Sequence, residues 1–358
     1  MVIKGRIYRF RRRGRMVRVG MVGLGHNGVA HLKAHRRVKK SEVVALCDSN
    51  PERLEAASKQ FGISRMYRSV EELCAQAAVE AVSIHTGDQF HAEPFVAAVR
   101  SGKHALVEKP LANTREQVET MVAAARAADP GQKLAVGYIL RFNPVFEKVR
   151  EVCRSGRMGQ IYYLEGDYIH NLLYQAKQTD TLTGVNWYLE YERPMVGGGS
   201  HSLDLLRWFS GAQVVEVSGY SNHVAFPQMK QDDCQVALFR FDSGAVAKVA
   251  ALYAPRLAVP PFYNLRVYGT MGTVERDQVA IAKDAEDVHP ALKPVDADRI
   301  SGHPYDTEID DWLDAIRENR PPRCDLFDGA NSAIASLVAV DAIAAGKALP
   351  VPVYRRET

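Results

Sequence analysis

A glycine-rich turn near the start of the chain constrains its fold more than any other feature. Gly23, Gly25 and Gly28 follow the apolar run Val17–Val22 with the spacing G-x-G-x-x-G. In this pattern the first glycine permits a tight turn, the second lets the backbone approach a pyrophosphate, and the third lets a helix pack closely on the sheet. The N-terminus of that helix offers N–H groups and a positive dipole to phosphates. The turn therefore predicts a strand, a phosphate-binding loop and a helix in succession.

An acidic residue extends this pattern into a dinucleotide site. Asp48 ends a second apolar run, residues 43–47, and follows Gly28 by 20 positions. A carboxylate at that place can accept hydrogen bonds from the hydroxyl pair of an adenosine ribose. It would also repel a 2′-phosphate, and the adjacent Ser49 and Asn50 bring no arginine to neutralise one, so we expect NAD to be preferred over NADP. Further expected cofactor contacts are His26, Asn27, Ser49 and Thr86.

The first 140 residues alternate strand and helix patterns. Alternation at this length predicts a parallel, doubly wound α/β sheet that binds its ligands at the carboxyl ends of the strands. We place this dinucleotide-binding domain at residues 16–140, behind a basic leader at residues 1–15 that we expect to be disordered, with Met16 as a candidate natural start. Beyond the two strands named above, the expected strands cover residues 81–84, 104–107 and 133–136, and the expected helices follow Asn50 and cover 91–100 and 114–128.

The pattern changes in the second half of the chain. Longer strands separated by turns such as Asp242-Ser-Gly244 predict an α+β domain, residues 141–358, with a large, open, mainly antiparallel sheet. The expected strands cover residues 160–168, 234–239, 245–250, 262–268, 272–275 and 351–353, and the expected helices cover 145–154 and 328–346.

Composition excludes several classes of partner. The chain has 358 residues, 46% of them hydrophobic and 25% charged, with a net charge of +4, so nothing requires a nucleic acid or a membrane surface. No run of about 18 apolar residues predicts a transmembrane helix. The cysteines are scattered and form no C-x-x-C pair, which favours reduced thiols in a cytoplasmic protein over a zinc site or disulfides. They are Cys47, Cys74, Cys153, Cys234 and Cys324.

Two histidines have a spacing that could bind a metal. His31 and His35 stand four residues apart on a predicted helix that is basic and offers no third ligand nearby. We therefore expect them on a solvated helix face and predict no metal site.

A lysine stands at the end of the strand predicted at 104–107. Pro110 disfavours helical backbone at Lys109, so the lysine side chain is expected to leave the strand end. In a doubly wound fold this edge carries the reactive half of the cofactor. A lysine there could orient a substrate hydroxyl and help to remove its proton, although a surface lysine in a loop would show the same local sequence.

Five motifs occur in an order and at separations that resemble the Gfo/Idh/MocA oxidoreductases, from about residue 17 to residue 353. The resemblance implies an N-terminal Rossmann domain and a C-terminal domain whose open sheet often forms the interface of a homodimer or homotetramer. It also implies hydride transfer between a carbon of a sugar or polyol and a nicotinamide. The motifs are the turn at 23–28, Asp48, and the segments 108–110, 137–144 and 199–204.

The resemblance also implies roles for single residues. Lys109 matches the catalytic lysine of the family, Glu108 would lie near the nicotinamide ribose, and His201 matches the histidine acid/base. From the residues alone, His201 opens an apolar helix behind three glycines, so it could equally cap that helix. Asp204, one turn later, could orient His201 or lie on the helix surface.

The chain departs from the inositol dehydrogenase pattern at one position. An aspartate stands four residues before the histidine in that pattern, whereas this chain has Gly197. We therefore expect no carboxylate–histidine relay and a wider pocket that suits a glycoside or nucleotide sugar. Tyr168 and Trp187 could stack on a sugar ring or belong to the core. The expected substrate contacts are Arg141, Asn143, Tyr168, His170, Trp187, His201 and Asp204.

Three functions remain open at this point. The first is an NAD-dependent dehydrogenase that acts on a secondary hydroxyl of a sugar, glycoside or cyclic polyol. The second is a glycosidase that uses NAD for transient oxidation, and the third is a non-enzymatic NAD-binding sensor. Loss of Lys109 or His201 would favour the sensor, and both residues are present. Release of NADH would distinguish the dehydrogenase from the glycosidase.

Overall fold

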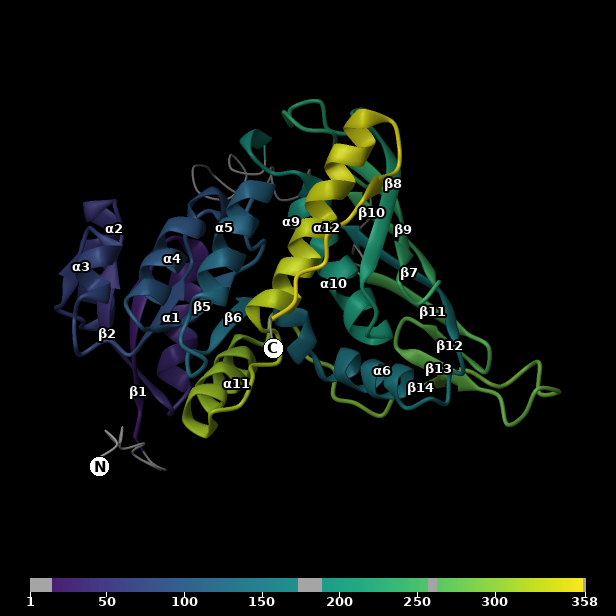
Figure 1. Cartoon of the computed structure of the whole chain (residues 1–358), viewed down its shortest axis with the longest axis horizontal. Helices are drawn as coiled ribbons and strands as arrows, with labels where there is room; N and C mark the ends of the chain where they lie inside the picture. Colours follow the sequence, from purple (N-terminus) through teal and green to yellow (C-terminus); the bar gives the residue numbers. More distant parts are fainter. Residues whose placement is uncertain (1–14, 173–188, 257–262, 357–358) are drawn as a thin grey trace, which may run out of the picture.

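The computed structural model describes residues 15–172, 189–256 and 263–356. In these residues the chain forms two β-sheets, one in each half, with helices packed around them (Figure 1). The N-terminal half lies on the left of the figure and the larger sheet on the right, with the long helix α12 (Leu326–Ala345) between them. The two halves share a continuous hydrophobic core.

The first sheet is parallel throughout and doubly wound, as the sequence predicts. Its strands are ordered β3-β2-β1-β4-β5-β6, so the chain reverses direction across the sheet between β1 and β4. Ligands bind at the carboxyl ends of strands beside such a reversal. The strands are β1 (Val17–Val22), β2 (Ser41–Cys47), β3 (Met66–Tyr67), β4 (Ala81–Ile84), β5 (His104–Glu108) and β6 (Leu134–Gly137).

Helices connect these strands and follow local sequence signals. Asn50 caps α2 by accepting hydrogen bonds from the backbone N–H groups of Glu52 and Arg53, and Pro51 occupies the first turn, where a missing N–H does no harm. Gly62 ends the helix in the left-handed conformation. The helices of this half are α1 (His26–Arg37), α2 (Pro51–Phe61), α3 (Val70–Cys74), η1 (Asp88–Phe90), α4 (Ala92–Arg100) and α5 (Arg115–Arg126).

The second sheet is large and mixed, and most of its pairings are antiparallel. Its order is β14-β13-β12-β11-β7-β10-β9-β8-β15, and only the β7–β10 pair is parallel among its pairings in the described residues. The expected final strand at 351–353 is wrong, because the pairing with β8 is made by Leu349–Pro350 instead. The strands are β7 (Ile161–Ile169), β8 (Val214–Asn222), β9 (Cys234–Phe241), β10 (Val246–Leu252), β11 (Tyr263–Gly269), β12 (Gly272–Glu275), β13 (Gln278–Ile281), β14 (Lys293–Pro294) and β15 (Leu349–Pro350).

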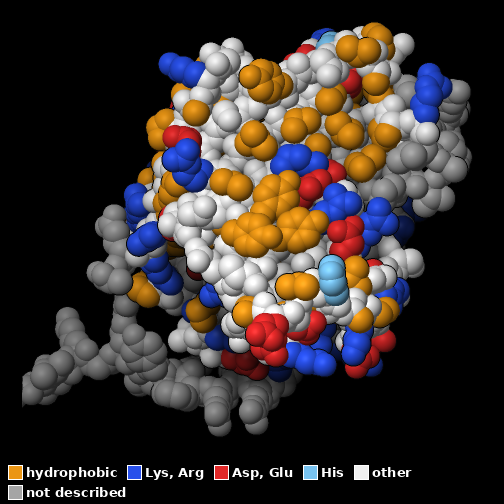
Figure 2. Space-filling view, turned by 90° about the vertical axis from the view of Figure 1, so that its right-hand side faces the viewer, with side chains coloured by type: hydrophobic (Ala, Val, Ile, Leu, Met, Phe, Trp, Pro, Cys, Tyr) orange, Lys and Arg blue, Asp and Glu red, His pale blue; other side chains and the backbone are white. Residues whose placement is uncertain are grey.

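Helices cover one face of this sheet. The helix α10 packs on β7 and β10, and α12 packs on β8, while α11 returns to the first half and packs on α1. The opposite face carries large exposed side chains such as Tyr220 and Leu238, and Figure 2 shows hydrophobic side chains gathered with charged ones on this side. The remaining helices are η2 (Ile139–Phe142), α6 (Pro144–Arg154), α9 (Pro194–Gly197), α10 (Gly199–Ser210) and α11 (Tyr305–Glu318).

The helix α12 is long and apolar enough to cross a membrane by length and composition alone. The sequence itself has no uninterrupted run of about 18 apolar residues and predicted no such segment. However, 72% of its apolar window is buried inside the protein, where α12 packs against α5, α10 and β8. Core helices of folded proteins pass the same test, so this is weak evidence for a span.

Candidate active site

A cavity of about 810 Å³ extends along the carboxyl ends of the parallel strands. Gly23, Gly25 and Asp48 line one end of it, and Lys109 lies further along. The opposite wall comes from the second half of the chain and includes Tyr168, Glu192 and Tyr253. The cavity therefore connects the glycine-rich turn, where the cofactor is expected to bind, with Lys109 and with the larger sheet.

The glycine turn has the backbone geometry that its sequence predicts. Gly23 has a φ of 85°, in the left-handed region, and a Cβ there would lie 2.6 Å from the backbone of His85 and Thr86. A Cβ on Gly28 would lie 1.9 Å from the Gly23 carbonyl oxygen, whereas a Cβ on Gly25 would meet nothing within 4 Å. The first and third glycines thus allow the chain to pack on itself, and the second faces open space, as close approach of a pyrophosphate requires.

Asp48 is held firmly beside this turn. Its carboxylate accepts hydrogen bonds from the backbone N–H groups of Leu24, at 2.7 Å, and Asn50, at 2.8 Å. The structure also places two arginines, Arg53 and Arg68, in the lining of the same cavity. Neither arginine is adjacent to Asp48 in the chain, so the residues next to that carboxylate do not reveal them. Of the other expected cofactor contacts, the lining includes His26, Asn27, Ser49, Thr86 and Glu108.

Lys109 reaches across the cavity to the second half of the chain. Its Nζ donates a hydrogen bond to the Gly197 carbonyl oxygen at 3.3 Å. The neighbouring Glu108 carboxylate accepts hydrogen bonds from His31 Nε2 at 3.0 Å and from the Lys109 backbone N–H at 2.9 Å. Burial opposes ionisation of Glu108, but the bond and charge of His31 prevail and lower its pKa.

The expectation that His31 and His35 lie on a solvated face is wrong. Both side chains are buried, and the His35 ring bonds Ser41 Oγ at 2.8 Å. Burial, aided by the charge of His31, lowers the pKa of His35 to about 3. The ligand atoms of His31, His85 and Glu108 lie within 4.8 Å of one another, a spacing that could hold a metal ion. The His31 and His85 ring centroids lie 3.9 Å apart, His31 Nε2 bonds Glu108, and His85 Nε2 bonds Ser83 Oγ.

His201 is buried at the start of α10, next to the cavity wall. Its ring stacks on Tyr168 with a centroid distance of 6.3 Å, and Tyr168 lines the cavity whereas His201 does not. Its Nδ1 has no hydrogen-bond partner among the described residues. Burial lowers the pKa of His201 well below its ordinary value, and the positive charge of Lys109 adds to this. The imidazole is therefore neutral under ordinary conditions.

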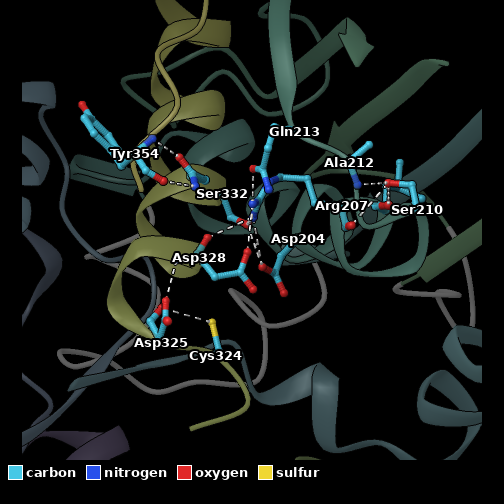
Figure 3. A network of polar contacts seen from close by, with 12 residues as sticks. Asp204, Arg207, Ser210, Ala212, Gln213, Cys324, Asp325, Asp328, Ser332 and Tyr354 are labelled. Carbon is cyan, nitrogen blue, oxygen red and sulfur yellow. Dashed lines mark hydrogen bonds and ion pairs between the residues drawn. The ribbon is translucent and has the colours of Figure 1, made fainter. Parts of the chain in front are cut away.

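The structure assigns Arg141 and Asp204 to a different environment from the one expected. Both are buried, and the Arg141 guanidinium binds the Asp204 carboxylate through two hydrogen bonds of 2.8 and 2.6 Å. Ser332 donates another to Asp204 at 2.6 Å. Figure 3 shows Asp204, Arg207, Asp328 and Ser332 pointing toward one another from α10 and α12. The predictions that Asp204 orients His201 and that these residues face the substrate are therefore wrong, since their polar atoms are engaged within the core.

The other expected substrate residues have mixed outcomes. Asn143 caps α6 by accepting a hydrogen bond from the Val145 N–H, and it does not line the cavity. His170 is buried against Tyr168, with the Tyr168 hydroxyl 3.4 Å from its Nδ1. Trp187 lies outside the described residues.

One residue of the cavity wall was not found from the sequence. The Glu192 side chain is buried, lines the cavity, and accepts a hydrogen bond from the Tyr253 hydroxyl at 2.5 Å. Burial raises the pKa of Glu192 to about 7, although the charge of Lys109 and the Tyr253 bond act against it. A search for carboxylates near Gly197 in the chain, rather than at that position alone, could have identified it.

Two family models match most of the chain. One, described as an oxidoreductase family with an NAD-binding Rossmann fold, matches residues 17–138. The other, described as a GFO/IDH/MocA C-terminal domain, matches residues 146–275.

Individual proteins with similar sequences and structures are dehydrogenases and reductases. The 1-carboxy-3-chloro-3,4-dihydroxycyclo hexa-1,5-diene dehydrogenase of Comamonas testosteroni is 31% identical over 65% of this chain, which spans 57% of that relative. The 1,5-anhydro-D-fructose reductase of Ensifer adhaerens is 28% identical over 94% of this chain and 99% of its own. The structure of a levoglucosan dehydrogenase in complex with NADH superposes with a TM-score of 0.81, at 23% identity, over 95% of this chain and 100% of that one.

Proposed function

The chain belongs to the GFO/IDH/MocA oxidoreductase family, and on that premise we propose that it is a dehydrogenase for a secondary hydroxyl of a sugar, glycoside or cyclic polyol. The names of its relatives, which include an anhydrofructose reductase and a levoglucosan dehydrogenase, support this substrate class. The observation that carries the proposal is the single cavity that joins the glycine turn and Asp48 to Lys109. Bound NAD⁺ supplies the hydride acceptor at this site.

Lys109 has the central role in this proposal. Its ammonium-bearing side chain crosses the cavity between the two halves of the chain, where a substrate hydroxyl could bind its Nζ in place of the Gly197 carbonyl. We assign proton transfer to Lys109 on this basis. The buried, neutral His201 would shape the wall behind Tyr168 and assist in proton transfer only if that wall rearranges.

A substrate panel tests the proposal. Purified protein is mixed with NAD⁺ and with single sugars, glycosides and inositols at alkaline pH, and NADH formation is followed by absorbance. A Lys109→Met variant gives the background rate for each compound. NADH release with a ketosugar product supports the dehydrogenase, whereas release of an aglycone without net NADH would replace it with the glycosidase. A panel that yields neither product would refute the proposal for this substrate class.

The exposed face of the large sheet suggests self-association. We propose a homodimer or homotetramer formed through this face, in the cytoplasm, where the five free cysteines stay reduced. Tyr220 and Leu238 are 86% and 57% exposed on neighbouring strands. The oligomeric state of Leu238→Glu, measured by sedimentation, tests this surface. The control is Val288→Glu, the same kind of change at a loop residue that is 72% exposed. A protein that sediments as a monomer before any substitution would exclude it.

A further inference from the structure

The space beside Gly197 is filled by another residue. A Cβ on Gly197 would lie 1.5 Å from Glu192 Oε1, 2.3 Å from its Cδ and 2.6 Å from its Oε2. The three nearest atoms to that missing side chain are thus the carboxyl group of Glu192. The expectation from the sequence that Gly197 widens the pocket is therefore wrong. The carboxylate of Glu192, five residues earlier in the chain, occupies the same place.

Lys109 and Glu192 approach Gly197 together. Lys109 Nζ donates to the Gly197 carbonyl oxygen, and the Glu192 carboxyl lies where a Cβ on Gly197 would stand. The charges of the two side chains interact, and the Tyr253 hydroxyl bonds the carboxyl from the large sheet. Glu192 as a whole residue is only 3% exposed to solvent, yet it contributes to the lining of the cavity. It is therefore a buried acid with access to the reaction space and a cation beside it.

We infer that Glu192 is the carboxylate partner of Lys109 in proton transfer, and that it replaces an aspartate at position 197 from a different point of the chain. This inference rests on the proposed dehydrogenase function. With NAD⁺ bound, the nicotinamide would take the electron pair of the substrate C–H bond as hydride while the C=O bond forms. As the Lys109 ammonium gives one of its protons to the Glu192 carboxylate, the resulting amine takes the hydroxyl proton, and Glu192 then releases its proton to solvent.

This role has a defined pH dependence. Burial raises the pKa of Glu192 to about 7, so its carboxylate can receive a proton above this pH and is already protonated below it. The rate of oxidation should therefore fall as the pH drops through about 7. His201 cannot produce this decline, since its pKa lies well below the ordinary range. The other groups facing Glu192 are Lys109, Asp88, Arg193 and Tyr253.

The principal test is the pH–rate profile of Glu192→Gln. The amide keeps the size of the side chain and can still bond Tyr253, but it cannot take up a proton. We expect kcat to fall by about 10²-fold at pH 8, the acid limb near pH 7 to disappear, and the Kd for NADH to stay within about twofold. A variant that retains the wild-type rate and acid limb would overturn the inference.

Moving the carboxylate back to position 197 gives a rescue experiment. Glu192→Ala removes the acid and the atoms that would clash with a side chain on Gly197. Gly197 has helical backbone at the end of α9, which any residue can adopt. Glu192→Ala combined with Gly197→Asp should recover at least tenfold of the lost kcat, because it restores a carboxylate beside Lys109. Failure to recover in a double variant that binds NADH normally would show that Glu192 acts only through packing.

Glu308 offers a matched control. Its carboxyl is buried in α11 and its pKa is also raised by burial, but it does not line the cavity. Glu308→Gln should therefore leave the acid limb in place. If Glu308→Gln also shifts the acid limb of the pH–rate profile, the limb does not report on Glu192 alone, and the proposed role of Glu192 is overturned.

A measurement without substrate separates this inference from the proposed function. Because the folded state raises the pKa of Glu192 above that of the unfolded chain, folding retains this proton, and the stability contribution declines as the pH rises from about 4.5 to 7. Thermal unfolding of Glu192→Gln should lack this part of the decline. If no sugar is oxidised but the stability difference appears, the proposed function fails while the buried acid stands. If the two proteins show the same pH dependence, Glu192 does not hold a proton near neutral pH.

Discussion

Two buried charged regions lie in the core of this protein, and they are built differently. In the cluster of Arg141, Asp204, Arg207 and Asp328, each charged group has at least one opposite charge within 4.0 Å, and hydrogen bonds join α10 to α12 (Figure 3). The region around Lys109 is looser. Lys109 reaches a carbonyl oxygen at 3.3 Å, and the His201 Nδ1 has no partner in the described residues.

This difference distinguishes charged residues that stabilise the fold from residues that can take part in a reaction. Buried charges that bind one another hold a fold in one arrangement, and removing one partner leaves the other charge uncompensated. Groups with free bonding capacity beside a cavity can bind and exchange a proton with a ligand. The sequence motifs contain both kinds, since Arg141 and Asp204 belong to the same family resemblance as Lys109. The resemblance alone does not say which residues face the substrate.

The sharpest test of the comparison is Lys109→Met, because it removes the cation from the looser region. We expect turnover to fall by about 10²- to 10⁴-fold, the usual range for a group in proton transfer. The midpoint of thermal unfolding should change little, since Lys109 makes one long hydrogen bond to Gly197. Turnover is measured with an accepted substrate, and the midpoint of thermal unfolding is measured by calorimetry on the same sample. A large loss of stability with intact turnover would reverse the assignment of the two regions.

Asp204→Asn tests the saturated cluster. It leaves the buried Arg141 guanidinium without its two-bond partner, so we expect the free energy of unfolding to fall by about 3–5 kcal/mol. Turnover per folded molecule should stay near the wild-type value. Urea denaturation measures the stability, with Asp341→Asn as the control, because the Arg115–Asp341 pair is exposed and worth at most about 1 kcal/mol. Equal effects of the two changes would contradict the structural role of the cluster.

His201→Asn tests a smaller effect at the border between the two regions. Burial lowers the pKa of His201 well below its ordinary value, so its ring is neutral where the acid limb is expected. We therefore expect a moderate loss of kcat, about tenfold or less, with the acid limb of the pH–rate profile unmoved. An acid limb that disappears in this variant would return the titration to His201.

Local features of the sequence predicted most of the fold and several of the residues that line the cavity. The glycine turn, Asp48 and Lys109 follow from the residues next to them, because a strand end and a tight turn are local events. Glu192 stands only five positions before Gly197, but no local pattern shows that its carboxyl occupies the site of the missing side chain at that position. The burial of His31 likewise depends on Glu108, 77 positions away, which no helix pattern contains.

Asp48 combines both kinds of environment, and its substitution is expected to change the choice of cofactor. It lines the cavity, yet its carboxylate is bound to the backbone N–H groups of Leu24 and Asn50. Asp48→Ala should reduce the preference for NAD over NADP by about tenfold, or ~1.4 kcal/mol, because the repulsion of a 2′-phosphate is lost. Titration of both cofactors measures this, with Asp48→Asn as the control that keeps an acceptor for the backbone.

Arg53 and Arg68 decide how that change is to be interpreted. Both line the cavity near Asp48 and could bind a 2′-phosphate once the carboxylate is gone. Adding Arg68→Ala to Asp48→Ala should then weaken NADP binding and leave NAD binding nearly unchanged, because only NADP carries the extra phosphate. If the second change weakens both cofactors equally, Arg68 supports the loop through its contact with the Ser49 carbonyl, and the carboxylate alone sets the preference.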